Sequence, residues 1–288
     1  MLKIGIIGAG SVGSAVGVLL QAKGHAIVGV SSRSECSALA LAKRLGTKIL
    51  TPQEVANAAE VVLITVNDGE IAKVATDLAE KNAFKNGQVV VHFSGSLPAE
   101  ILAPARDFGA TIVSIHPLQS CAGVERAIKN LPRSVFSIEG EEAAFNTAEK
   151  LVRDLEGRFF YIDGKDKMLY HAAAVIISNY TITLADISKR LLQNLSVPPE
   201  LGMQGMLTLL KGTVANLEAF GTPQALTGPI ARGDANVVSE HLKQLSSSMP
   251  QLVNMYQEMA LQTLEVALAK ETITAQQADM LQSVIRED

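Results

Sequence analysis

Two histidines and a lysine are the residues of this sequence whose types and positions best suit acid–base chemistry. His116 directly follows an apolar, strand-like run and precedes a proline, so its imidazole is expected at the mouth of a cleft. Lys167 and His171 are one turn apart on a predicted helix and therefore share a face. Because an imidazole exchanges its proton near neutral pH, His116 and His171 are the candidate general acid or base. Lys167 is the fallback proton donor.

Three polar residues are candidates for orienting a substrate. Ser94 follows the apolar run 89–93, and Asn179 lies two turns beyond the second histidine on the same helix. Arg232, in a glycine-bracketed segment between helices, suits a substrate carboxylate. Each has a structural alternative: Ser94 can cap the short helix that follows it, Asn179 can serve an interhelical network or a dimer contact, and Arg232 can form a weak surface pair with Asp234.

A glycine-rich turn near the N-terminus predicts a dinucleotide site. The turn directly follows the strand-like run 3–7 and opens a helix. In this pattern the first glycine allows a tight turn, the second lets a pyrophosphate approach the backbone, and the third lets the helix pack closely against the strand. The phosphates then lie on free N–H groups at the helix N-terminus. The candidate cofactor-binding residues of the turn are Gly8, Ala9, Gly10, Ser11, Val12 and Gly13.

The end of the second predicted strand favours NADP over NAD. NAD-specific sites place an acidic residue about 20 residues after the glycine turn, where it accepts hydrogen bonds from the ribose hydroxyls. Here Ser32 and Arg33 occupy that region, and a hydroxyl and a guanidinium suit a 2′-phosphate. The alternative is that Arg33 is solvated and Glu35 reaches in. Asn67, which follows the run 61–66, is a further candidate cofactor contact or an ordinary helix N-cap.

The first part of the chain has the pattern of an α/β domain. Nearly continuous apolar runs alternate with alanine-rich, helix-period stretches, which is typical of a parallel sheet covered by helices on both faces. Residues 1–163 are therefore predicted to form a doubly wound Rossmann domain that binds NAD(P). The predicted strands cover residues 3–7, 27–30, 61–66, 89–93, 111–115, 134–139 and 158–162.

The strand pattern stops after Gly164, and residues 164–288 are predicted to form an all-helical domain for substrate binding or dimerisation. The apolar helices 172–184 and 251–268 expose more surface than the other short helices can cover, which favours a homodimer through this domain. The predicted helices cover residues 165–194, 199–220, 236–244, 251–270 and 274–285.

Composition points to a small-molecule protein of the cytoplasm. The net charge of -4 gives no global cationic field for nucleic acid or an anionic membrane. The two cysteines, Cys36 and Cys121, are far apart and lack metal-ligand spacing, so neither a disulfide framework nor a metal site is expected. The sequence begins in a strand-like run rather than a signal peptide. The most apolar stretch, 172–184, falls short of the roughly 20 residues that a bilayer requires.

Together, the motifs resemble those of the Rossmann-like proteins that carry a C-terminal domain of unknown function, DUF2520. This group is itself similar to the 6-phosphogluconate dehydrogenase-like superfamily, whose enzymes use NAD(P) and whose helical C-terminal domain often dimerises. The resemblance covers nearly the whole chain. It rests on the glycine turn and on Val66-Asn67-Asp68, His116-Pro117-Leu118-Gln119, Tyr170-His171-Ala172-Ala173-Ala174, Ser178-Asn179-Tyr180 and the segment 226–234.

The resemblance carries over only part of a catalytic site. Hydroxyacid dehydrogenases of that superfamily place a catalytic lysine and an asparagine one turn apart on the first long helix after the sheet domain. Here that helix has His171, with Val175 one turn on and Asn179 two turns on. Ser94 with the glycine after it resembles the serine–glycine stretch that contacts substrate in those enzymes.

The leading hypothesis is an NADP-dependent oxidoreductase. It would transfer a hydride between nicotinamide and a small carbonyl, imine or hydroxy acid bound between the two domains. The alternative is a regulatory or sensor protein that binds NADP(H) and turns nothing over.

Overall fold

The computed structural model describes residues 1–287, and the chain divides into two compact units, Met1–Ile182 and a second unit that begins at Thr183. The division falls within the helix α7 (Lys167–Asn194). The predicted boundary at 163/164 lies just before this helix instead. The difference arises because the first residue of α7, Lys167, is fully buried in the first unit, so the beginning of the helix belongs with the sheet.

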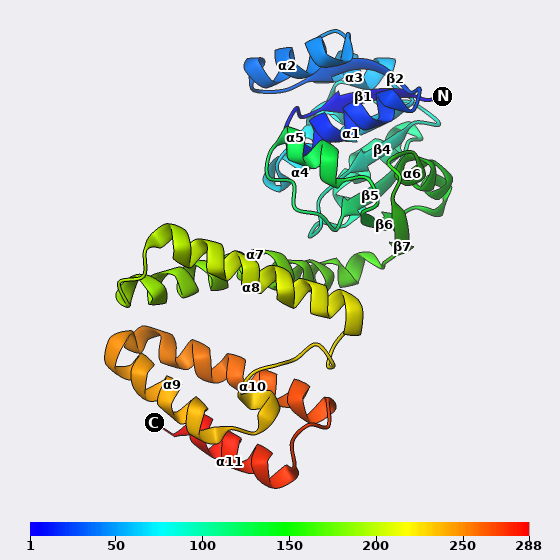
Figure 1. Ribbon diagram of the computed structural model, residues 1–288. Helices are drawn as coiled ribbons and strands as arrows, with labels where there is room; N and C mark the ends of the chain where they lie inside the picture. The colour runs from blue at the N-terminus through cyan, green and yellow to red at the C-terminus, as the bar shows by residue number, and fades with distance from the viewer. Residues whose placement is uncertain (288) are drawn as a thin grey trace. The chain divides into compact units, whose positions relative to one another are not determined.

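The first unit is built on a seven-stranded sheet with the order β2-β1-β3-β4-β5-β6-β7, which confirms the predicted Rossmann fold (Figure 1). The strand order reverses at β1, which lies between β2 and β3, and ligands of such sheets bind at the carboxyl ends of the strands around this switch point. The strands are β1 (Lys3–Ile7), β2 (Ala26–Ser31), β3 (Val61–Ile64), β4 (Val89–His92), β5 (Thr111–Pro117), β6 (Val135–Gly140) and β7 (Arg158–Tyr161).

Two features of the sheet differ from the sequence prediction. β6 runs antiparallel to β5, although the pairs from β2 to β5 and the pair β6–β7 are parallel. In addition, β5 continues to Pro117, so His116 lies within the strand rather than in a turn after it. The reason is the antiparallel ladder, in which His116 pairs with Ser137 and Pro117 with Phe136.

Helices cover both faces of the sheet and bury one apolar cluster on each side. β3 and β4 are buried along their whole length, as expected for strands between two helical layers. The helical segments of this unit before α7 are α1 (Ser11–Ala22), α2 (Glu35–Leu45), α3 (Pro52–Ala58), α4 (Asp68–Glu80), α5 (Val124–Asn130), α6 (Glu142–Asp154) and the 3₁₀ segments η1 (Ala99–Phe108) and η2 (Gly164–Asp166).

The second unit is helical, as predicted. Its core comes mainly from α9, α10 and α11, whereas α8 buries one residue, Gly202. Its elements after α7 are α8 (Pro199–Phe220), η3 (Ile230–Arg232), α9 (Ala235–Ser248), η4 (Pro250–Leu252), α10 (Val253–Ala269) and α11 (Ala275–Arg286).

α7 is longer than the apolar stretch 172–184, which by itself is too short to span a bilayer. Together with η2 it forms a helical run, Gly164–Asn194, which by length and composition alone could cross a membrane. A helix covered by protein in a soluble assembly meets the same criteria. Large apolar side chains on α7 and α8 are exposed in the single chain, among them Ile177, Ile182, Leu201 and Leu209.

Candidate functional site

The glycine turn between β1 and α1 has the conformation that a dinucleotide site requires. Gly8 has a φ of +115°, and a Cβ atom there would lie 2.5 Å from the carbonyl carbon of Thr65. A Cβ on Gly13 would overlap the Gly8 carbonyl oxygen and the Thr65 hydroxyl, so only glycine lets α1 pack this closely. Gly10 is different, because, apart from Gly10 and its chain neighbours, no atom of the described residues lies within 4 Å of its ideal Cβ position. The start of α1 therefore has open space beside its first N–H groups.

A cavity of about 320 Å³ begins at this turn. One side is formed by the start of α1, including Gly10, Ser11 and Val12, and the other by the residues after β3 and β4. The cavity thus lies at the carboxyl ends of the parallel strands, where the fold places its ligands. Its remaining lining residues are Thr65, Val66, Asn67, Asp68, Phe93 and Ser94.

The residues predicted to select the cofactor lie at the end of β2. Arg33 is 72% exposed, and its guanidinium forms an ion pair of 3.0 Å with Glu70 in the first turn of α4. Ser32 is half-buried. Glu35 is exposed and begins α2. The ion pair links β2 to α4 and holds the guanidinium at the edge of the sheet without burying it.

A serine-rich loop, Ser94–Pro98, forms the far end of the cavity and is tied to α4. The Ser94 and Ser96 hydroxyls donate hydrogen bonds of 2.7 and 3.1 Å to Asp68 Oδ2. The Ser94 hydroxyl also accepts the backbone N–H of Leu97 at 3.1 Å. Ser94 therefore shapes the local turn and also lines the cavity. Asn67 occupies the N-cap position of α4 but makes no capping hydrogen bond with its side chain.

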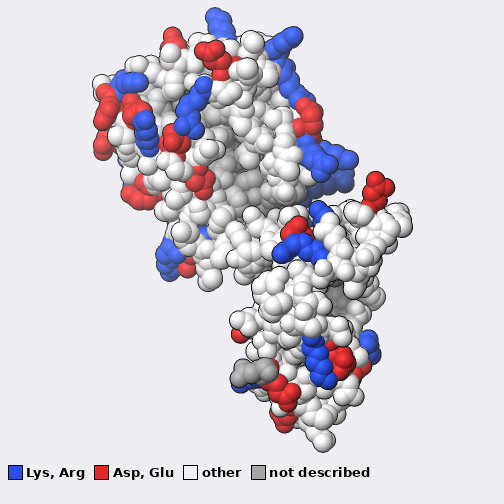
Figure 2. Space-filling view, turned by 90° about the vertical axis from the view of Figure 1, so that its left-hand side faces the viewer, with Lys and Arg blue, Asp and Glu red and all other residues white. Residues whose placement is uncertain are grey.

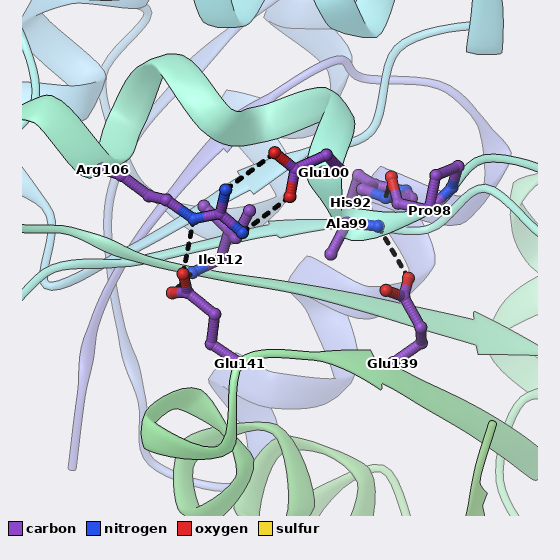
Figure 3. Close-up of polar contacts among 8 residues, drawn as sticks. All are labelled: His92, Pro98, Ala99, Glu100, Arg106, Ile112, Glu139 and Glu141. Carbon is purple, nitrogen blue, oxygen red and sulfur yellow. Dashed lines mark hydrogen bonds and ion pairs between the residues drawn. The ribbon is translucent and has the colours of Figure 1, made fainter. Parts of the chain in front are cut away.

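Buried polar side chains also hold the backbone of the loop Ser94–Pro98 through hydrogen bonds. Fully buried His92 accepts the backbone N–H of Ser94 at 3.1 Å on Nδ1, so its other nitrogen, Nε2, donates to the Pro98 carbonyl at 3.3 Å. Glu139 accepts the N–H of Ala99 at 2.6 Å, as Figure 3 shows. Burial lowers the pKa of His92 to about 3, and the charge of Lys167 adds to this effect. His92 is therefore a neutral structural group.

Carboxylates on the strand β6 and the turn after it anchor η1, the segment that follows the loop (Figure 3). Arg106 of η1 is hydrogen-bonded to Glu100 and Glu141, and Glu141 also accepts the N–H of Ile112 at 2.9 Å. Hydrogen bonds thus hold the loop at Ser94 and at Ala99, where η1 begins, and the contacts of Arg106 hold the other end of η1.

Lys167, named as a fallback proton donor, is buried under this loop. Its Nζ donates to the Ser94 carbonyl at 3.1 Å and to the Ser114 hydroxyl at 2.6 Å, and its exposed fraction is 0%. Burial lowers the Lys167 pKa to about 8, although the charges of Glu139 and Asp68 act in the opposite direction. At neutral pH it is therefore a buried cation that supports the loop and is closed to a ligand.

The two imidazoles that the sequence singled out lie together at this loop. The His116 and His171 rings are 6.2 Å apart between centroids and nearly perpendicular, at 73°. Both lie against Gly95, where a Cβ would be 2.7 Å from His116 Nε2 and 2.8 Å from His171 Cδ2. Burial lowers the His116 pKa to about 4, and the charge of Lys167 and the neighbouring His171 contribute to this.

Two further predicted residues come later in the chain. Asn179, further along α7, is exposed in the single chain and has a contact of its own. Arg232 lies in η3 of the second unit and is also exposed.

Sequence reasoning missed Tyr170 as a member of the site. It raised Asp68 only as a helix cap or ligand contact, and Gly95 only through the likeness of the serine–glycine stretch. The Tyr170 hydroxyl is 2.7 Å from His116 Nδ1, and the rings meet edge-on. The available signal was its position beside His171 in an otherwise apolar helix. The asparagine–aspartate pair after β3 suggested a helix cap rather than an acceptor for two serines.

The sequence matches two families. Residues 1–117 match the family described as a Rossmann-like domain, and residues 134–263 match the domain of unknown function DUF2520. No curated protein sequence matches the chain.

Solved structures similar to this chain extend over nearly its full length. Protein TM1727 of Thermotoga maritima is 32% identical, with a TM-score of 0.75 over 93% of this chain and 99% of that protein. BF3122 of Bacteroides fragilis, described as a candidate NADP oxidoreductase, is 25% identical, with a TM-score of 0.74 over 92% and 98%. An imine reductase of Myxococcus stipitatus in complex with NADP⁺ is 17% identical, with a TM-score of 0.64 over 99% and 100%, and shows likeness of fold alone.

Proposed function

This chain belongs to the Rossmann-like proteins with a C-terminal DUF2520 domain, and from that premise we propose that it is an NADP-dependent oxidoreductase. The reaction proposed is hydride transfer between nicotinamide and a small carbonyl, imine or hydroxy acid. The observation that carries the proposal is the cavity that runs from the glycine turn to Ser94, because the next residue, Gly95, contacts both imidazoles.

The residues around the glycine turn fit a dinucleotide phosphate. Gly10 leaves open space at the start of α1, where Ser11 and Val12 line the cavity, and the free N–H groups there suit a pyrophosphate. Ser32 and Arg33 suit a 2′-phosphate, which would take over the guanidinium that now pairs with Glu70. The similar structures described as an NADP oxidoreductase or solved with NADP⁺ support this choice of cofactor.

The bound nicotinamide supplies or accepts the hydride, so the protein must supply a proton and orient the substrate. His116 is neutral at pH 7, because its pKa is about 4, and it is therefore suited to hydrogen bonding rather than to donating an imidazolium proton. We assign proton transfer to His171. Neither of its ring nitrogens makes a hydrogen bond to another described residue, which leaves both available to a ligand.

Other residues have supporting roles in this proposal. Lys167 holds the Ser94 carbonyl and thereby the loop on which the two imidazoles rest. Ser94 and Asn179 are proposed to orient the substrate, and Arg232 to hold its carboxylate when there is one.

The test is NADPH oxidation with a panel of small carbonyl compounds and imines, comparing the wild type with His171→Ala. Loss of the proton donor should lower turnover about 100-fold or more, while calorimetry gives an unchanged affinity for NADPH. His241→Ala is the control, because this histidine is exposed and lies in the second unit. Unchanged turnover in His171→Ala would make His171 structural. Tight NADPH binding without oxidation of the cofactor by any compound would favour the sensor alternative.

A further inference from the structure

His116 has a second aromatic neighbour that the proposed reaction does not use. Tyr170, the residue before His171 on α7, places its hydroxyl 2.7 Å from His116 Nδ1. The ring centroids are 5.5 Å apart and the planes stand at 88°, so the contact is made edge-on through the hydroxyl rather than by stacking. The opposite side of the imidazole, with Nε2, faces Gly95.

Chemistry decides which partner donates in this hydrogen bond. A phenol is a stronger acid than a neutral imidazole N–H, and an imidazole nitrogen is a stronger base than a phenol oxygen. Tyr170 O–H therefore donates to Nδ1, which leaves the imidazole proton on Nε2.

The neighbouring Ser137 points to the same arrangement. Its hydroxyl is fully buried on β6 and makes no hydrogen bond to a described residue, although it is close enough to the phenol to offset part of the rise that burial causes in the Tyr170 pKa. When the phenol proton is directed at His116, the phenol oxygen can accept the Ser137 O–H, so that Nδ1, the phenol and Ser137 each have a partner.

We propose that Tyr170 is a positioning residue, which locks His116 in the tautomer with its proton on Nε2 and so presents a neutral N–H donor to the substrate beside Gly95 and His171. Nε2 makes no hydrogen bond to a described residue and is not among the buried, unpartnered side-chain atoms, so a ligand can reach it. The group it would hold is a hydrogen-bond acceptor, such as the oxygen of a carbonyl or hydroxy acid. This role in catalysis rests on the proposed function.

The charged groups around His116 are consistent with a neutral donor. Lys167 and His171 both disfavour its protonation, and Asp68 favours it only weakly by comparison, so that the pKa is about 4. A fixed neutral N–H can stabilise developing negative charge on an oxygen without first binding a proton from solvent.

Histidine-selective ¹⁵N labelling and two-bond ¹H–¹⁵N correlation spectra test the tautomer without any substrate. In the wild type at pH 7, His116 should show a protonated Nε2 and an unprotonated Nδ1. Tyr170→Phe should bring a measurable share of the Nδ1-protonated tautomer. Wild-type His116 found as the Nδ1-protonated tautomer would overturn the proposal, as would an unchanged tautomer in Tyr170→Phe.

The chain contains a matched control pair. His241 Nδ1 and the Tyr256 hydroxyl are 2.8 Å apart, with ring centroids 5.9 Å apart at 90°, but this histidine is exposed. Tyr256→Phe should change only the His241 signals and leave His116 as in the wild type.

Kinetics then separates this proposal from the proposed function. Tyr170→Phe should lower kcat about tenfold, with little change in the dissociation constant for NADPH. A correct tautomer in a protein without turnover would sustain the positioning role of Tyr170 and refute only the oxidoreductase function. Full turnover in a Tyr170→Phe variant whose tautomer has changed would refute the catalytic role of the Nε2 proton.

Discussion

At the scale of single residues, burial determines the protonation states of two neighbouring groups, the His116 imidazole and the Lys167 amine. His116 has a pKa of about 4 and Lys167 of about 8, so at neutral pH the proton is on the lysine. The buried cation has two fixed acceptors, Ser94 and Ser114, which offset part of its desolvation. This leaves His171 as the imidazole available for proton transfer.

Gly95 is the residue whose substitution tests this geometry most sharply. A Cβ at position 95 would lie 2.7 Å from His116 and 2.8 Å from His171, so Gly95→Ala must displace both rings. A displacement of about 1 Å can lower a rate on the order of 100-fold, and we expect a loss of that size in kcat with NADPH affinity retained. NADPH oxidation and calorimetry measure the two quantities.

The control for this substitution is Gly69→Ala in the first turn of α4. Outside the chain neighbours and the helix's own backbone, no atom of the described residues lies within 4 Å of the Cβ that this change would add, and alanine favours a helix. Equal turnover in Gly95→Ala and the wild type would show that the two imidazoles need not be held where the structure places them.

The glycine turn and the choice of His116 and His171 could be predicted from the sequence, because a local motif and a polar residue within an apolar run can be recognised without knowing the fold. The sequence did not show the partners of these residues. Tyr170 reaches His116 only because the start of α7 packs against β5, and the burial of Lys167 depends on the same contact. Helical spacing showed that Lys167 and His171 share a face, but not that one of them would be fully buried.

At the scale of elements, the apolar periodicity predicted all seven strands to within a few residues. It also predicted α8 with the bounds that are observed, because prolines precede this helix and a glycine follows it. The direction of β6 could not be read in this way, because a buried strand looks the same in either orientation. That direction also decided the end of β5, since the antiparallel ladder extends it through His116.

The helices α7 and α8 support a prediction about association. Ile177 and Leu209 are 70% and 73% exposed in the single chain, and apolar faces of this kind are normally covered by a partner. We expect a homodimer at micromolar concentration in sedimentation experiments. Leu209→Glu should shift the equilibrium to the monomer, because it would bury an unpaired carboxylate in the interface.

Leu39→Glu is the matched control for association. This leucine is 60% exposed on α2 of the sheet unit, and its substitution should leave the sedimentation of the dimer unchanged. A wild-type monomer at micromolar concentration would contradict the prediction.

At the scale of the whole molecule, the chain carries a net charge of -4 yet is proposed to bind an anionic cofactor. Basic and acidic side chains are interspersed on the face of the sheet unit that Figure 2 draws. Binding must therefore come from local groups, namely the N–H groups at the start of α1 and the guanidinium of Arg33, rather than from a global field. The similar structures cover more than nine-tenths of both chains, so the likeness of fold extends over nearly the full length.

The most direct test of the proposed function uses NADPH that carries deuterium at the transferred position of C4. The wild type, incubated with the panel of carbonyl compounds and imines, should yield a product with one deuterium on the former carbonyl or imine carbon, as measured by mass spectrometry and NMR. Tight binding of NADPH with no deuterium in any product would contradict the assignment of this protein as an oxidoreductase for these substrates.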